Sequence, residues 1–270
     1  MNKLDTLQKI LRDSGSALIA YSGGTDSSLL LAVASQVLGK NILAVTAVSD
    51  LMTKEEIDEA QSIANNLGVR HLLLPVDDLK NPDFAANTPE RCYHCKKQRF
   101  VVLKEIALKY NLNAVLDGSN LDDLKDYRPG HRAIHELGIK SPLLEAGMTK
   151  ADIRLLAKQL GLPNWNKSAQ ACLASRIPYG TTITKDLLER IGKAESCLRE
   201  LFPGQQIRVR DYGQIALLEV PPESFPTIIT YETAQTICKE LKMLGYSQIA
   251  LDLQGYRQGS TNENILKKQE

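Results

Sequence analysis

The residues best suited to chemistry begin with a run rich in glycine and serine, SGGTDSS at positions 22–28. This run lies between an apolar run at 17–20 and a helix pattern at 26–38, so we expect a strand, a tight loop and a helix. Glycines let the backbone approach an anion, and the amides and positive dipole of a helix N-terminus attract phosphate. Because an acid beside phosphate requires a divalent cation between them, Asp26 is a predicted Mg²⁺ ligand.

An ordinary strand-to-helix turn, capped by serine and aspartate, is the alternative interpretation of the same run. We favour phosphate binding because the serines, the aspartate and the strand–loop–helix context all agree with it. The run is neither a lysine-containing triphosphate loop nor a dinucleotide fingerprint, since it lacks both GxxxxGK and GxGxxG. The residues predicted to contact the phosphate or its Mg²⁺ are Ser22, Gly23, Gly24, Asp26, Ser27 and Ser28.

The run resembles the SGGxDS loop of the ATP pyrophosphatases, or PP-loop family, which cleave ATP to AMP and pyrophosphate while adenylating a substrate. The resemblance implies that the loop holds the pyrophosphate portion of ATP, and that Ala20 and residues 46–49, beginning with Thr46, flank the adenylate. Asp117 and Gly118 follow an apolar run and are predicted to contact nucleotide or metal at the same sheet edge. The alternative is that they only form a turn.

Three of the five cysteines form the second group suited to chemistry. Cys92 and Cys95 are three residues apart near the start of a helix pattern, so their thiols share one face. With Cys172, in a loop-like stretch, they could bind zinc with a histidine, act as a redox pair, form a disulfide, or hold a 4Fe-4S cluster with one open iron. Cys197 and Cys238 are expected to be buried small hydrophobes. Nearby basic residues favour thiolates: Lys96, Lys97 and Arg99.

Longer motifs resemble the LarE family of ATP-dependent sulfur transferases over nearly the whole chain. The motifs are DYRPG at 126–130, NWNK at 164–167, CLASRIPYGT at 172–181, RVR at 208–210 and DLQGYR at 252–257. Members of this family help to make the nickel-pincer cofactor of lactate racemase, by converting the carboxylates of a pyridinium-3,5-dicarboxylate mononucleotide into thiocarboxylates. The resemblance implies ATP and Mg²⁺ as cofactors and a small nucleotide as the substrate.

The resemblance also implies where the transferred sulfur comes from. Family members with a single cysteine at the position of Cys172 give up its own sulfur and are left with dehydroalanine. Members that also carry C-x-x-C, here Cys92 and Cys95, are considered to bind a 4Fe-4S cluster through all three thiols. We therefore expect a cluster-type member, and the alternative is a sacrificial nucleophile at Cys172.

Arginines and a serine complete the candidate site. Arg208 and Arg210 are two residues apart on a predicted strand, so both side chains lie on the same face. A solvated strand face would explain that spacing, but paired guanidiniums suit a phosphate group, and the resemblance favours the phosphate of the substrate. Ser175 and Arg176 adjoin Cys172 and are predicted to hold the substrate or the adenylate.

The elements that must position these residues alternate between strand and helix over the first two thirds of the chain. Apolar runs lie at 17–20, 42–48, 71–76 and 114–116, and helix patterns at 26–38, 53–66, 89–109 and 152–160. This alternation predicts an α/β fold, with a parallel sheet covered by helices on both faces. We predict a PP-loop domain at 1–180 and a smaller α+β domain at 181–270, with a partly disordered polar tail at 258–270.

Composition restricts the partners. Thirty-three basic and thirty-two acidic residues leave a net charge of +1, which argues against general nucleic-acid or membrane binding. The apolar runs fall short of the roughly 20 residues that a membrane helix needs, and the N-terminus shows no signal pattern, so we expect a cytoplasmic protein. We also expect the chain to form a homo-oligomer, and to have as a partner another protein that donates sulfide or persulfide.

Three other functions share the same phosphate loop. A tRNA thiolase would need a basic RNA-binding surface, which a balanced charge does not favour. An amidating ligase of the NAD- or GMP-synthetase kind would need a source of ammonia and would leave the three cysteines unexplained. A nucleotide-sensing module would bind ATP without releasing pyrophosphate.

Overall fold

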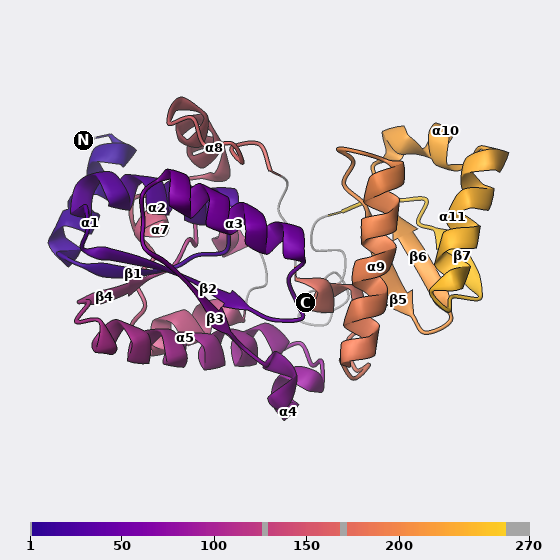
Figure 1. Cartoon of the computed structure of the whole chain (residues 1–270), viewed down its shortest axis with the longest axis horizontal. Helices are drawn as coiled ribbons and strands as arrows, with labels where there is room; N and C mark the ends of the chain where they lie inside the picture. Colours follow the sequence, from indigo (N-terminus) through magenta and orange to yellow (C-terminus); the bar gives the residue numbers. More distant parts are fainter. Residues whose placement is uncertain (1, 126–128, 168–171, 258–270) are drawn as a thin grey trace. The chain divides into compact units, whose positions relative to one another are not determined.

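The computed structural model describes residues 2–125, 129–167 and 172–257, and divides into two compact units (Figure 1). The first unit comprises Met1–Asp78 and Glu90–Gln170, and the second comprises Leu79–Pro89 and Ala171–Glu270. The sequence-based domain boundary between residues 180 and 181 stays a prediction. The tail at 258–270 and part of the DYRPG motif, residues 126–128, lie outside the described residues.

The first unit contains a four-stranded parallel sheet in the order β3-β2-β1-β4. Its strands are β1 (Ala17–Ala20), β2 (Ile42–Val48), β3 (His71–Pro75) and β4 (Ala114–Leu116). Ala17 pairs with Ile42 on one side and with Ala114 on the other. The strand order therefore reverses between β1 and β4, which is the point where open α/β sheets bind ligands. The predicted parallel α/β fold is confirmed.

Helices cover both faces of this sheet (Figure 1). They are α1 (Lys3–Ser14), α2 (Thr25–Leu38), α3 (Lys54–Asn66), α5 (Arg91–Lys109), α6 (Gly130–Glu136), α7 (Pro142–Glu145) and α8 (Lys150–Gln159). Because neighbours along a strand face opposite sides, Ile19 packs in the core with α1, α2 and α8, while Leu18 packs with Phe100 of α5. The alternating strands and helices thus build two cores around one sheet.

Local capping sets where several helices begin. Thr53 and Glu56 form a complete capping box at the start of α3, as the sequence predicts. Thr149 and Asp152 form another at the start of α8, so this helix begins two positions before the expected Asp152. Hydrogen bonds from Lys3 and Thr149 lower the pKa of Asp152 to about 2.

The second unit has its own three-stranded sheet, in the order β5-β6-β7. Its elements are α4 (Pro82–Ala85), α9 (Lys185–Leu201), β5 (Arg208–Tyr212), β6 (Ile215–Glu219), α10 (Phe225–Ile228), α11 (Tyr231–Met243) and β7 (Gln248–Leu251). β5 and β6 are antiparallel, whereas β6 and β7 are parallel. Val209, Leu218 and Leu241 belong to its separate hydrophobic core. A small second α+β region is therefore confirmed.

The first strand of this sheet differs from its expected bounds. The sequence predicts a strand at 206–210 followed by a turn at 211–213, but β5 runs from Arg208 to Tyr212. Asp211 stays in the strand because its carboxylate is bound by Arg190 at 2.7 and 2.9 Å and by the Tyr246 hydroxyl at 2.8 Å. The turn therefore moves to Gly213, whose φ of 74° suits glycine.

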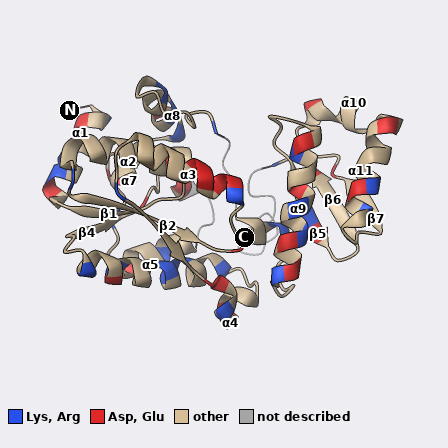
Figure 2. Cartoon of the chain, viewed as in Figure 1, with Lys and Arg blue, Asp and Glu red and all other residues tan. Residues whose placement is uncertain are grey.

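No helix in the described parts of the chain is both long and apolar enough to cross a bilayer. Acidic and basic residues are interspersed along helices such as α9 (Figure 2). Opposite charges therefore lie close together along this helix, as in the pairs of Lys185 and Lys193 with Glu189.

Asn87 ties residues 79–89 to the rest of the second unit. It is fully buried and has a left-handed backbone, with φ of 53°. Its side-chain amide donates to the carbonyls of Ile177, Pro178 and Thr181 at 3.4, 2.8 and 2.9 Å. Asparagine suits this position because it tolerates the left-handed region and carries two amide hydrogens.

Substitutions at Asn87 should separate these two contributions. Asn87→Gly removes the side-chain hydrogen bonds without adding left-handed strain and should lower the free energy of unfolding by about 1–3 kcal/mol. Asn87→Ala adds left-handed strain of about 1 kcal/mol. Urea denaturation followed by circular dichroism measures both. Asn111→Ala is the control, because Asn111 has nearly the same φ of 54° with an exposed side chain. A wild-type transition for Asn87→Gly would contradict the assignment.

Candidate functional site

The phosphate loop, residues 22–28, joins β1 to α2 in the first unit. Gly24 is the N-cap of α2, and no side chain caps the helix there. The exposed Ser22 has its Oγ 3.1 Å from Ser27 Oγ and accepts a hydrogen bond from the Gly24 amide at 3.4 Å. Polar groups therefore gather at a helix N-terminus, which is the arrangement that binds anions.

Gly23 is a position where only glycine fits. Its φ is 73°, and an added Cβ would lie 2.8 Å from the Cβ of Ala60 on α3. The loop backbone can therefore lie directly against α3.

The loop after β4 meets the phosphate loop, as the sequence predicts for the shared sheet edge. An added Cβ on Gly118 would lie 3.1 Å from the Ser27 amide nitrogen. Asn120 Nδ2 donates to Asp26 Oδ2 at 3.1 Å. Asp26 is half-buried, so its carboxylate lies at the edge of the loop rather than in the core. The structure thus brings together the predicted Asp26, Ser27 and Gly118.

Asp117, beside Gly118, is buried and heavily hydrogen-bonded. It accepts hydrogen bonds from Ser119 Oγ and Ser141 Oγ, both at 2.6 Å. Lys96 Nζ lies 3.6 Å from Asp117 Oδ2. These contacts fix the carboxylate as part of the loop framework.

Lys96 is a candidate that sequence reasoning did not place. It comes from α5 and passes Gly130, where an added Cβ would lie 2.7 Å from Lys96 Cδ. Lys96, Lys97 and Arg99 are predicted from the sequence to favour thiolates at the nearby cysteines. In the structure each also has an acidic partner: Lys97 pairs with Glu136, and Arg99 pairs with Asp78. No local pattern signals these pairings, since each partner lies on another element.

The predicted adenylate side contains a buried hydrogen-bond chain. Thr46 Oγ1 donates to the Tyr21 carbonyl at 2.7 Å and lies 2.8 Å from His71 Nε2. Because the hydroxyl has only one hydrogen, His71 Nε2 is the donor to Thr46. Burial lowers the pKa of His71, which favours this neutral form. Ala20 is half-buried at the end of β1.

The three predicted cysteine ligands belong to different units. Cys92 is exposed and Cys95 half-buried near the start of α5 in the first unit, and Cys95 Sγ lies 3.6 Å from Asp78 Oδ1. Cys172 is exposed and precedes the 3₁₀-helix Leu173–Arg176 in the second unit. Across the described ranges, no three His, Cys, Asp or Glu residues are grouped to hold a metal. Cys197 and Cys238, expected to be buried, are intermediate in exposure.

Buried ion pairs surround Ser175 in the second unit. Arg176 donates to both carboxylate oxygens of Glu195 at 2.7 and 3.0 Å. Arg210 donates to both oxygens of Glu219 at 2.5 and 2.9 Å, and to the Ser175 carbonyl at 2.8 Å. Two-point pairing holds each guanidinium in one plane. Any anion bound here must therefore share these arginines with a carboxylate.

Arg208 adds a further positive charge to this region. It is buried on β5, two residues from Arg210, and its guanidinium lies 5.4 Å from the centre of the Tyr256 ring. Burial, and then the charge of Arg176, lower the pKa of Arg208. A buried cation beside another cation is stabilised by a bound anion, which fits the predicted phosphate contact.

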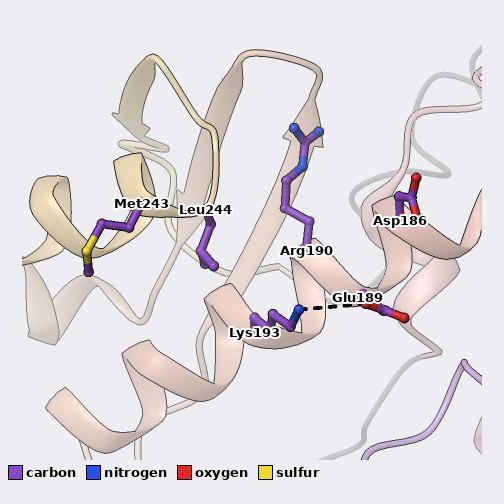
Figure 3. Close-up of a pocket in the computed structure, with 6 residues that line it drawn as sticks. All are labelled: Asp186, Glu189, Arg190, Lys193, Met243 and Leu244. Carbon is purple, nitrogen blue, oxygen red and sulfur yellow. Dashed lines mark ion pairs between the residues drawn. The ribbon is translucent and has the colours of Figure 1, made fainter.

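A pocket of about 340 Å³ lies elsewhere in the second unit. It is lined by Asp186, Glu189, Arg190, Lys193, Met243 and Leu244 (Figure 3). Lys193 Nζ pairs with Glu189 at 3.6 Å, and the Arg190 guanidinium binds Asp211. None of the lining residues is a predicted site residue, and both basic residues of the lining pair with carboxylates of the same unit.

The amino-acid sequence of this chain is similar to those of several known proteins of about the same length. A family model described as queuosine biosynthesis protein QueC matches residues 16–98, which include the phosphate loop. An uncharacterized protein of Synechocystis sp. is 41% identical over 98% of this chain and 99% of its own length. The pyridinium-3,5-bisthiocarboxylic acid mononucleotide synthase of Lactiplantibacillus plantarum is 40% identical over 99% of this chain and 96% of its own length. An uncharacterized protein of Methanocaldococcus jannaschii is 32% identical over 89% of this chain and 90% of its own length.

The lowered pKa of His71 predicts a pH dependence of stability. In the unfolded chain His71 has the ordinary histidine pKa of about 6.5, so its imidazole binds a proton more readily there than in the folded protein. The contribution of neutral His71 is therefore complete above about pH 6.5 and is lost as pH falls through the folded pKa. Between about pH 7 and about pH 5, the wild-type melting temperature should fall more steeply than that of His71→Gln. His135→Gln, at an exposed position, should keep the wild-type slope; equal slopes for all three proteins would refute the prediction.

Proposed function

Because this chain belongs to the LarE family of ATP-dependent sulfur transferases, we propose that it converts a carboxylate of pyridinium-3,5-dicarboxylate mononucleotide into a thiocarboxylate. The observation that carries the proposal is the full-length similarity to the synthase of L. plantarum. This comparison confirms the resemblance seen in the sequence motifs. The phosphate loop at the reversal point of the sheet supports the ATP-dependent half of the reaction.

The first step of the proposed reaction activates the carboxylate. A carboxylate oxygen attacks the α-phosphorus of ATP, the bond to the bridging oxygen breaks, and pyrophosphate leaves. The phosphate loop would hold the leaving pyrophosphate through the amide of Gly24 and the hydroxyls of Ser22 and Ser27. Asp26, with Mg²⁺, would offset the charge that accumulates on the departing oxygens. Asp117 and Gly118 would complete this edge, and Ala20 and Thr46 would flank the adenylate.

The second step replaces AMP with sulfur. A sulfur nucleophile attacks the activated carbonyl carbon, the bond to the AMP oxygen breaks, and a thiocarboxylate forms. Arg208 and Arg210 would hold the phosphate of the substrate, which is supported by the buried positive charge around β5. Ser175 and Arg176 would orient the reacting group beside Cys172.

We further propose that Cys92, Cys95 and Cys172 hold a 4Fe-4S cluster. The donor set fits this group, because it consists of three thiols, none of which is buried, and two of them share one helix turn. A bound cluster would supply sulfide for the transfer. Sacrificial donation of the sulfur of Cys172 is the alternative, and its exposed position suits that role as well.

The proposal also includes a cytoplasmic enzyme made of several copies and supplied by a sulfide- or persulfide-donating protein. A tRNA thiolase and an amidating ligase are the rival functions. The mixed charge along the helices, shown in Figure 2, gives neither of them specific support.

Product analysis tests the main proposal. Purified protein with ATP, Mg²⁺ and the dicarboxylate mononucleotide should form AMP, pyrophosphate and a product in which sulfur replaces an oxygen, as measured by mass spectrometry. Gly23→Ala should abolish the reaction, because the added methyl group collides with Ala60. If AMP formed only with tRNA or ammonia as the acceptor, a rival function would replace this one.

Metal analysis tests the cluster. Protein purified without oxygen should be brown and contain about four irons per chain. Cys92→Ser and Cys172→Ser should lose this iron, whereas Cys238→Ser, a cysteine outside the proposed ligand set, should retain it. After turnover, Cys172 should keep its sulfur in mass spectrometry. Colourless protein containing zinc would contradict the cluster, and loss of sulfur at Cys172 would establish the sacrificial route.

A further inference from the structure

Asn164 fastens the phosphate loop from a distant segment of the chain. The residue is only 3% exposed and follows α8, in the first unit. Its Nδ2 donates to the Gly23 carbonyl at 2.8 Å and to Ser28 Oγ at 2.9 Å. Its own carbonyl accepts a hydrogen bond from Thr25 Oγ1 at 2.7 Å. A single residue, 141 positions after Gly23, thus holds three loop residues.

The bond to Gly23 sets the orientation of the next amide. In a trans peptide, the carbonyl oxygen and the following N–H point in opposite directions, and the described chain has no cis peptide. Because the Gly23 oxygen is bound on the buried side by Asn164, the Gly24 N–H points toward the exposed side. Ser22 Oγ, on an exposed residue, lies 3.4 Å from that amide. The anchor therefore directs a backbone donor to where an anion would bind.

Ser28 belongs to this anchor. Its side chain is fully buried, and its Oγ lies 3.4 Å from the Tyr21 hydroxyl as well as being bound by Asn164. Burial raises the pKa of Tyr21 to about 12, so the hydroxyl remains protonated. Ser28, predicted from the sequence as a phosphate contact, is engaged behind the loop rather than at its exposed side.

A second contact supports the same role for this segment. Lys167, three residues after Asn164, forms an ion pair with Glu59 on α3. The next residue of α3, Ala60, lies against Gly23. Residues 164–167 therefore hold the loop and the helix behind it to the same short segment.

The side-chain oxygen of Asn164 shows which hydrogen bonds orient its amide group. Asn164 Oδ1 is buried and accepts no hydrogen bond from the part of the chain that the structure describes. The orientation of the amide is therefore set by the two hydrogen bonds that Nδ2 donates. Aspartate has nearly the same shape but cannot donate them.

We propose that Asn164 is a positioning residue that keeps the phosphate loop in the conformation that receives the pyrophosphate portion of ATP. The inference rests on the proposed function, since it assumes that the loop binds this portion. Asn164 acts through the peptide between Gly23 and Gly24, and does not itself touch the nucleotide. AMP has no pyrophosphate portion, so its binding does not depend on this peptide.

Calorimetry with two ligands tests the inference. In the presence of Mg²⁺, Asn164→Ala and Asn164→Asp should bind inorganic pyrophosphate about tenfold or more weakly than the wild type. Both variants should bind AMP with wild-type affinity, a difference that a general loss of structure would not produce. Asn166→Ala is the matched control, because Asn166 is exposed in the same segment, and it should bind both ligands normally.

The outcomes separate this inference from the proposed function. If the wild type bound no pyrophosphate, both would fail. Only the inference would fail if the wild type bound pyrophosphate and Asn164→Ala bound it equally well. The same holds if Asn164→Ala lost affinity for AMP as strongly as for pyrophosphate. Should Asn164→Ala not fold, Thr25→Val tests the same anchor, because it removes the hydrogen bond to the Asn164 carbonyl. Thr25→Val should weaken the binding of pyrophosphate but not of AMP, and Thr25→Ser should bind pyrophosphate as the wild type does. Unchanged pyrophosphate binding by Thr25→Val would overturn the inference.

Discussion

The first unit depends on one constraint, the reversal of strand order between β1 and β4. Strands on the two sides of a reversal send their following loops in different directions, which leaves a crevice above the carboxyl ends. Here the loops after β1 and β4 still meet, because Gly118 has no side chain to separate it from the Ser27 amide. The contact places a helix N-terminus, an acidic residue and a buried carboxylate at one edge. The chemistry proposed for ATP needs these groups together.

The second unit is governed by the cost of burying charge. Arg176 and Arg210 are buried with a carboxylate bound at two points each, as such charges require. Arg208 is buried beside Arg176, and its lowered pKa records the cost of that placement. These buried guanidiniums support the proposal that an anion binds here, and the overall charge of the protein would not reveal them.

Sequence reasoning predicted elements whose signals are local. The four strands of the first sheet and the capping box at Thr53 agree with the structure, because alternation and capping act over a few residues. It misplaced β5, since Asp211 looks like a turn residue until Arg190 and Tyr246 bind it. It did not predict the ion pair of Lys96 with Asp117, which follows a different element, β4. Partners brought together by folding leave no pattern in the local sequence.

The sequence by itself determined the family, because the phosphate loop and the longer motifs at 164–167, 172–181 and 252–257 are contiguous runs of residues that can be recognised without a structure. Tertiary structure decided which residues of the phosphate loop are exposed and which are buried behind it. Ser28 lies behind the loop, where Asn164 binds it. The sequence motifs that contain these residues do not distinguish contact with a ligand from support of the loop. The physical reason is that a hydrogen bond depends on distance and direction in space, and residues separated by more than a hundred positions acquire these only when the core forms.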